Sequence, residues 1–115
     1  MGPVKRYGSV IELRPERIDE YMQLHAAVWP EVYARISASN ITNFTIFRRE
    51  FPDGKHYLFM YYEYVGTDHD ADARAIAADP KTQEWWRLTD PCQQGLSNRA
   101  EGEWWASMTE VCHNP

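Results

Sequence analysis

One stretch of the sequence brings a phenol, an imidazole and an indole to regular spacing. Tyr21, His25 and Trp29 follow one another at intervals of four residues, and residues four apart in a helix lie one turn apart on the same side. Imidazole titrates near neutral pH and can serve as general acid and general base, whereas a phenol, with a pKa of about 10, is better suited to donating a proton. The Tyr21–His25 pair therefore predicts proton-transfer chemistry. The alternative is that His25 is a hydrogen-bonded core residue of an apolar helix face.

Two pairs of adjacent tryptophans are the second unusual feature. Four of the five tryptophans form the pairs Trp85-Trp86 and Trp104-Trp105. Neighbouring side chains on a helix diverge by about 100°, so Trp85 and Trp86 cannot both face one core, and one of them can line a cavity. Aromatic walls with a few polar groups suit a sugar. For Trp104-Trp105 we expect a structural role, with one indole facing the sheet interior and the other facing a dimer partner.

Sequence patterns predict the elements that position these residues. Pro30 interrupts the helical stripe that starts at residue 18, so this helix either kinks there or restarts with Pro30 in its first turn, and Asn40 closes it. Residues 52–54 form the turn of a hairpin, and Asp79-Pro80 caps and starts a helix. Strands are predicted over residues 5–13, 43–50, 56–65 and 105–113, and helices over residues 18–39, 68–78 and 80–90. The order β-α-β-β-α-β is that of the ferredoxin-like α+β fold, a four-stranded antiparallel sheet with helices on one face.

The predicted long strand is apolar or aromatic on both faces. An antiparallel sheet that is covered on one face only usually shows a polar second face. A second copy of the chain is the simplest cover for the open face, so we predict a homodimer. The alternative is a monomer with a tyrosine-rich, solvated face. The two sides of the strand carry His56, Leu58, Met60, Tyr62 and Tyr64, and Tyr57, Phe59, Tyr61 and Val65.

Composition excludes several function classes. The chain has 115 residues, the size of one domain spanning residues 1–115, and its net charge of −5 with scattered basic residues argues against a nucleic-acid partner. No apolar run is long enough for a membrane span, and no apolar signal segment opens the chain. Cys92 and Cys112 fit a cytoplasmic protein with reduced thiols. Histidines and cysteines lack zinc-site spacing, so we expect no metal.

The sequence resembles the L-rhamnose mutarotase family along its whole length. The resemblance rests on EYMQLHAAVWPE at residues 20–31, NFTIF at 43–47, the Trp85-Trp86 pair and EVCHNP at 110–115. Within the first segment, the pattern Y-x3-H-x3-W-P-E is the most specific part. The resemblance implies a dimeric ferredoxin-like α+β barrel. It also implies a cofactor-free, metal-free isomerase that interconverts the α and β anomers of a 6-deoxy-L-hexose.

The same resemblance implies roles for individual residues. His25 takes the place of the catalytic acid/base, Tyr21 that of its hydroxyl-bearing neighbour, and Trp85 and Trp86 those of the pocket wall. Trp29, as part of the motif, is expected at the substrate. Mutarotation suits these residue types, because one group must deprotonate the anomeric hydroxyl while another protonates the ring oxygen.

One segment departs from the family pattern. Many family members carry a segment of the type Asn-Pro-Asp-Asn-Ser-Pro before the last strand, whereas this chain has TDPCQQGLSNR at residues 89–99. Asp90, Gln93 and Arg99 are candidate contacts to sugar hydroxyls, and the alternative for them is a solvated loop. Since L-rhamnose and L-fucose differ in ring stereochemistry, the changed loop favours L-fucose over L-rhamnose. His56, His69 and His113 are expected to be exposed.

Two other function classes stay open at this stage. Dimeric ferredoxin-like monooxygenases that act on haem or on small aromatic substrates also carry a helix histidine and a tryptophan, an analogy of fold alone. A non-catalytic sugar-binding module would also account for the aromatic residues.

Overall fold

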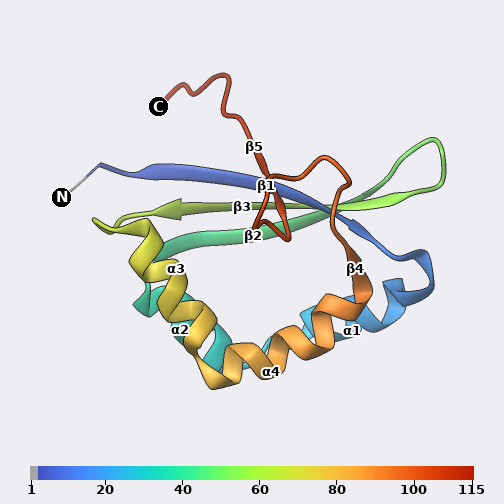
Figure 1. The fold of residues 1–115 in the computed structure, drawn as a ribbon, viewed down its shortest axis with the longest axis horizontal. Coiled ribbons are helices and arrows are strands. Elements are labelled where there is room, and N and C mark those ends of the chain that lie inside the picture. Colours follow the sequence, from blue (N-terminus) through green and yellow to red (C-terminus); the bar gives the residue numbers. More distant parts are fainter. Residues whose placement is uncertain (1–2) are drawn as a thin grey trace.

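The computed structural model describes residues 3–115, so the first two residues of the predicted domain lie outside the described residues. Within residues 3–115, one antiparallel sheet has the strand order β2-β3-β1-β4, and β5 also pairs with β1. The helices all cover the same face of this sheet (Figure 1), as the ferredoxin-like fold requires. The strands are β1 (Lys5–Leu13), β2 (Ile41–Glu50), β3 (His56–Tyr64), β4 (Gln93–Gln94) and β5 (Ala106–Met108); the α-helices are α1 (Ile18–Ala26), α2 (Pro30–Ala38), α3 (His69–Ala78) and α4 (Pro80–Thr89).

The long helix predicted after residue 18 is two helices. α1 ends at Ala26, and α2 restarts with Pro30 in its first turn. Trp29 precedes this proline in an extended conformation, with φ −61° and ψ 132°, because the proline ring disfavours the helical region for the residue before it. Asn40 follows α2 with φ +65°, the left-handed conformation common after a helix end. The predicted helix end at Asn40 is therefore confirmed.

Aspartate caps begin the two helices that follow the hairpin. The Asp68 side chain accepts a hydrogen bond from the backbone N–H of Ala71 at 3.1 Å, and that of Asp79 accepts from the backbone N–H of Thr82 at 2.9 Å. Each bond satisfies an N–H group that has no partner within its helix. Asp79-Pro80 is the predicted helix start, and α3 and α4 follow each other across the sheet face.

The predicted last strand over residues 105–113 is wrong in extent. β5 comprises Ala106–Met108 alone and pairs with Gly8–Val10, whereas the unpredicted β4 pairs with the end of β1 at Glu12 and Leu13. The two short strands thus share the edge of β1 that a single fourth strand would occupy. Beyond β5 the chain stays beside β1 through a side-chain contact, since Arg6 Nε lies 2.6 Å from Glu110 Oε1.

The core lies between the sheet and α1. Ile11 and Leu58 are neighbours in the β1–β3 register and, with Leu13, Tyr21 and Cys92, form the buried cluster. Removing such a buried leucine side chain typically costs about 2–5 kcal/mol. Cys92 and Cys112 are free thiols. Among the described residues, no helix combines the length and apolar character needed to cross a bilayer.

Candidate active site

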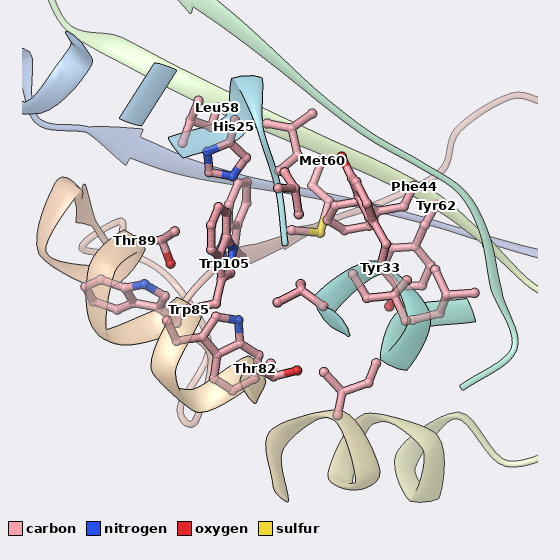
Figure 2. A pocket seen from close by; sticks show the side chains of 18 of the residues that line it. His25, Tyr33, Phe44, Leu58, Met60, Tyr62, Thr82, Trp85, Thr89 and Trp105 are labelled. Carbon is pink, nitrogen blue, oxygen red and sulfur yellow. The ribbon is translucent and has the colours of Figure 1, made fainter. Parts of the chain in front are cut away.

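A cavity of about 680 Å³ lies between the helices and the covered face of the sheet. Its wall is mostly aromatic and aliphatic, a composition typical of small-molecule sites. Figure 2 shows His25 and Trp85 on one side of this space and Tyr33, Phe44 and Tyr62 on the other. We call the first side the proximal end and the second the distal end.

Tyr21 and His25 lie together at the proximal end, on α1. Their rings stack with centroids 4.0 Å apart and planes 25° apart, as the four-residue spacing predicts. His25 Nδ1 lies 3.0 Å from the carbonyl oxygen of Tyr21. A carbonyl can only accept, so Nδ1 carries the hydrogen, and Nε2 holds the lone pair of the neutral ring.

Burial sets the protonation of this pair. It lowers the pKa of His25, and the weaker effect of the bond to the Tyr21 carbonyl opposes it. Burial also raises the pKa of Tyr21. Desolvation disfavours the charged form of each group, so at neutral pH His25 is an unprotonated base and Tyr21 a protonated phenol.

Gln93 and Trp104 fix the direction of the hydrogen bonds around Tyr21. Trp104 Nε1 donates to Gln93 Oε1 at 2.9 Å, and Gln93 Nε2 donates to the Tyr21 hydroxyl at 3.4 Å. Because indole can only donate, the amide oxygen must face Trp104 and the amide nitrogen must face Tyr21. The Tyr21 oxygen therefore accepts within the protein, and its own proton remains available.

Both members of the helix pair Trp85-Trp86 line the cavity. Trp85 is buried and meets His25 edge-on, with centroids 5.4 Å apart, whereas Trp86 is 38% exposed. Trp29 does not lie in the wall, contrary to the expectation that it contacts substrate. It packs behind Trp85 at 5.2 Å, because the break before Pro30 turns it away from the α1 stripe. Trp29 thus supports the wall from outside.

The altered loop contributes two of its three candidates to the cavity. Asp90 and Gln93 line it, and burial raises the pKa of Asp90. Arg99 lies outside the wall. Its guanidinium sits 5.7 Å from the Trp104 ring centroid, and Nη1 donates to the backbone oxygen of Leu96 at 2.9 Å. Arg99 therefore supports the indole of Trp104 and is not a hydroxyl contact of the cavity.

Sequence reasoning missed the second tryptophan pair and His69 as cavity residues. Trp105 packs against the core as expected, and both Trp104 and Trp105 line the cavity. The sequence signal for this role was the pair itself, since Trp104-Trp105 repeats the tandem pattern of the cavity-lining pair Trp85-Trp86. An indole N–H that leaves solvent also needs an acceptor, here Gln93.

Two histidines are less exposed than expected. His69 opens α3 and stacks on Tyr7 at 4.2 Å, and its Nε2 lies 2.7 Å from the Tyr62 hydroxyl. The Asp68 cap starts the helix at this point and brings the imidazole over the sheet. The His56 side chain is 12% exposed and lies between Arg48 and Glu50. His113 is exposed, as predicted. Across residues 3–115, no three His, Cys, Asp or Glu side chains are grouped so that they could hold a metal ion.

Comparisons with known proteins show the family of the chain. The chain is 35% identical over 115 residues to a UPF0734 protein of Dictyostelium discoideum, covering 93% of this chain and 87% of that protein. It is 28% identical over 97 residues to an L-rhamnose mutarotase of Listeria monocytogenes, covering 84% and 88%. The crystal structure of an L-rhamnose mutarotase from Formosa agariphila superposes with a TM-score of 0.72 at 16% identity, covering 96% of this chain and 99% of that one. A family model described as L-rhamnose mutarotase matches residues 6–114, and the chain therefore belongs to the L-rhamnose mutarotase family.

Proposed function

We propose that this protein is a mutarotase that interconverts the α and β anomers of a 6-deoxy-L-hexose. The observation that carries the proposal is the stacked Tyr21–His25 pair at the proximal end, where a neutral imidazole adjoins a protonated phenol. Family membership supports a carbohydrate isomerase and argues against the monooxygenase alternative. L-Rhamnose is the substrate that the family favours. L-Fucose is the alternative that the altered loop suggests, since Asp90 and Gln93 of that loop line the cavity.

The mechanism that we propose uses both members of the pair. His25 Nε2 takes the proton from the anomeric O1–H, and the freed electron pair forms the C1=O bond. The C1–O5 bond breaks, and O5 receives the hydroxyl proton of Tyr21. Rotation about C1–C2 presents the other face of the aldehyde, and the reverse steps close the ring as the second anomer.

The surroundings of the pair support these roles. The imidazolium and the phenolate that form are stacked against each other, so their opposite charges offset one another in a partly buried site. The raised pKa of Tyr21 favours the return of its proton when the ring closes. Gln93 donates a hydrogen bond to the Tyr21 oxygen, which leaves the Tyr21 O–H free to donate to O5.

Anomer exchange measured by saturation-transfer NMR tests the proposal directly. L-Rhamnose and L-fucose each exchange slowly in buffer, and we expect the protein to accelerate at least one of them in a concentration-dependent way. The ratio of the two accelerations identifies the preferred sugar. Binding without acceleration of either sugar would contradict the enzyme and favour the sugar-binding module.

We also propose a homodimer formed through the open face of the sheet. Phe59 of β3 lies on this face opposite Phe47 of β2, which is 63% exposed. Phe51 stacks on Phe59 at 6.2 Å and meets Tyr57 edge-on at 4.7 Å. A contiguous aromatic surface of this kind is typical of a contact between identical subunits. Light scattering of the wild type should give twice the chain mass of 13.5 kDa. The Phe59→Glu variant should give the mass of a single chain. A wild-type monomer would contradict the proposal.

A further inference from the structure

The cavity is larger than the proposed monosaccharide needs. A 6-deoxyhexose has about eleven non-hydrogen atoms, and even at about 30 Å³ each, the volume that one water molecule takes in the liquid, it fills about 330 Å³. The cavity measures about 680 Å³. A sugar held at His25 and Tyr21 therefore leaves roughly half of the space, which lies toward the distal end.

Aromatic rings form the wall of the distal end. Tyr33, Phe44, Tyr62 and His69 all line it, and Figure 2 places the first three across the cavity from His25 and Trp85. The His69 ring is held between Tyr7, at 4.2 Å, and the edge of Tyr64, at 5.1 Å. This end therefore offers flat, well-supported apolar faces of the kind on which a pyranose packs.

The distal end also offers hydrogen-bonding groups to a ligand. Asp72 lines the cavity and accepts two bonds, from the Tyr64 hydroxyl and from Asn40 Nδ2, both at Oδ2. Among residues 3–115, no donor reaches its Oδ1, so this oxygen can accept from a ligand hydroxyl. Tyr62 and His69 share one hydrogen bond of 2.7 Å. The phenol brings one donor and the imidazole at least one, so at least one donor remains unused.

We propose that the distal end binds a second pyranose, so that the protein also acts on reducing disaccharides whose reducing unit is the 6-deoxyhexose. This inference rests on the proposed mutarotase function. Mutarotation requires a free anomeric centre at His25 and Tyr21, which turns the opposite side of the ring, with its O4, toward the rest of the cavity. A disaccharide of about 22 non-hydrogen atoms fills at most about 660 Å³ by the same measure, within the volume available.

The test compares free L-rhamnose with L-rhamnose that carries β-D-glucose on its O4, both followed by saturation-transfer NMR. The wild type should act on the disaccharide with a lower KM than on the free sugar. Asp72→Asn should raise the KM for the disaccharide about tenfold, as the loss of one charge-assisted hydrogen bond predicts, and leave the kinetics of free L-rhamnose unchanged. Asp19→Asn is the matched control. It makes the same change at an exposed position of α1 and should change the kinetics of neither sugar.

A second variant guards against a folding effect of Asp72→Asn. Tyr33 is 49% exposed, so Tyr33→Ala leaves the core intact and removes one aromatic face of the distal end. Tyr33→Ala should also raise the KM for the disaccharide and leave the KM for free L-rhamnose unchanged. Exchange of free L-rhamnose with no preference for the disaccharide, and no selective effect of either variant, would overturn the second-sugar inference and leave the proposed function standing. Absence of exchange with both of these sugars and with free L-fucose would overturn the proposed function itself.

Discussion

The cavity contains two histidine–tyrosine pairs with opposite internal bonding. In the proximal pair, His25 bonds to a backbone carbonyl and the Tyr21 hydroxyl accepts from Gln93, so the two side chains stack without using each other's polar atoms. In the distal pair, the Tyr62 hydroxyl and His69 Nε2 bond to each other at 2.7 Å. The first pair keeps a lone pair and a proton for a substrate, whereas the second largely satisfies itself.

This difference separates proton transfer from binding. A general base needs a lone pair that no protein donor occupies, and a general acid needs a proton that no protein acceptor holds. The proximal pair meets both conditions because Gln93 and the α1 backbone take up the other atoms. Burial raises the pKa of Tyr62 to about 12 and also raises that of Tyr21, so burial does not separate the two phenols. In the distal pair, the bond between Tyr62 and His69 engages their polar atoms, which favours a binding role.

Replacing His25 or His69 should give the largest difference in activity between matched variants of the two pairs. We expect His25→Gln to reduce the enzyme-catalysed exchange of the free sugar by about 10²–10⁴-fold, the usual contribution of general acid–base catalysis. His69→Gln should reduce it by less than about threefold, because the distal end does not touch the free sugar's anomeric centre. Saturation-transfer NMR on both variants measures this contrast. Equal losses in the two variants would contradict the division between the ends.

Removing the two hydroxyls should give the next contrast. Tyr21→Phe should lower kcat by about 10²-fold, since it deletes the proton donor to the ring oxygen. It should also destabilise the fold by about 1–3 kcal/mol, because the buried Gln93 amide loses its acceptor. Tyr62→Phe should leave kcat for the free sugar near the wild-type value. Chemical denaturation measures the stability of each variant, and a Tyr21→Phe loss of activity explained by unfolding alone would contradict the catalytic role.

Gln93→Glu should reverse one hydrogen bond without removing a side chain. A carboxylate still accepts from Trp104 Nε1, but it cannot donate to Tyr21 and instead accepts the phenol proton. We expect kcat to fall about tenfold with little change in KM, since the variant competes with the ring oxygen for that proton. Gln93→Met is the control, because it removes the donor to Tyr21 but supplies no acceptor for the phenol proton. A rise in KM with unchanged kcat would instead make Gln93 a substrate contact.

The proximal pair was predictable from sequence because it is local. Tyr21 and His25 lie on one helical turn, and their stacking follows from helix geometry alone. The same holds for the Asp68 and Asp79 caps and for the helix restart at Pro30, each of which depends on neighbouring residues. The element order follows from these signals, and the ferredoxin-like arrangement follows from the order.

The features that sequence reasoning missed depend on contacts between distant segments. The Gln93–Trp104 bond joins residues on either side of a loop, and the Tyr62–His69 bond depends on where α3 begins relative to β3. The split of the last strand is also set by tertiary structure, because β4 and β5 pair with different parts of β1. Trp29 illustrates the reverse case. Its spacing fits the α1 stripe, but the break before Pro30 rotates it behind Trp85.

The pH dependence of activity and of stability should show the smallest difference between the two pairs, but this difference is specific to His25. Burial lowers the pKa of His25 from its ordinary value of 6.5, so kcat/KM should hold as the pH drops to 6.5 and fall only below it. Between pH 6.5 and the lowered pKa, His25 binds a proton in the unfolded chain but not in the folded chain. The free energy of unfolding should therefore decrease as the pH falls from 6.5 toward the lowered pKa, by at most about 1.4 kcal/mol per pH unit.

His25→Gln supplies the matched measurement for this prediction. Denaturant midpoints of the wild type and of the variant, taken between pH 5 and 8, should converge at lower pH, because only the wild type loses stability at this position as protons bind. The His69→Gln variant should keep the wild-type pH profile, because it leaves His25 and its surroundings unchanged. A His25→Gln profile parallel to the wild type would mean that His25 is as easily protonated in the folded chain as in the unfolded chain, and would remove the basis for its role as a neutral base.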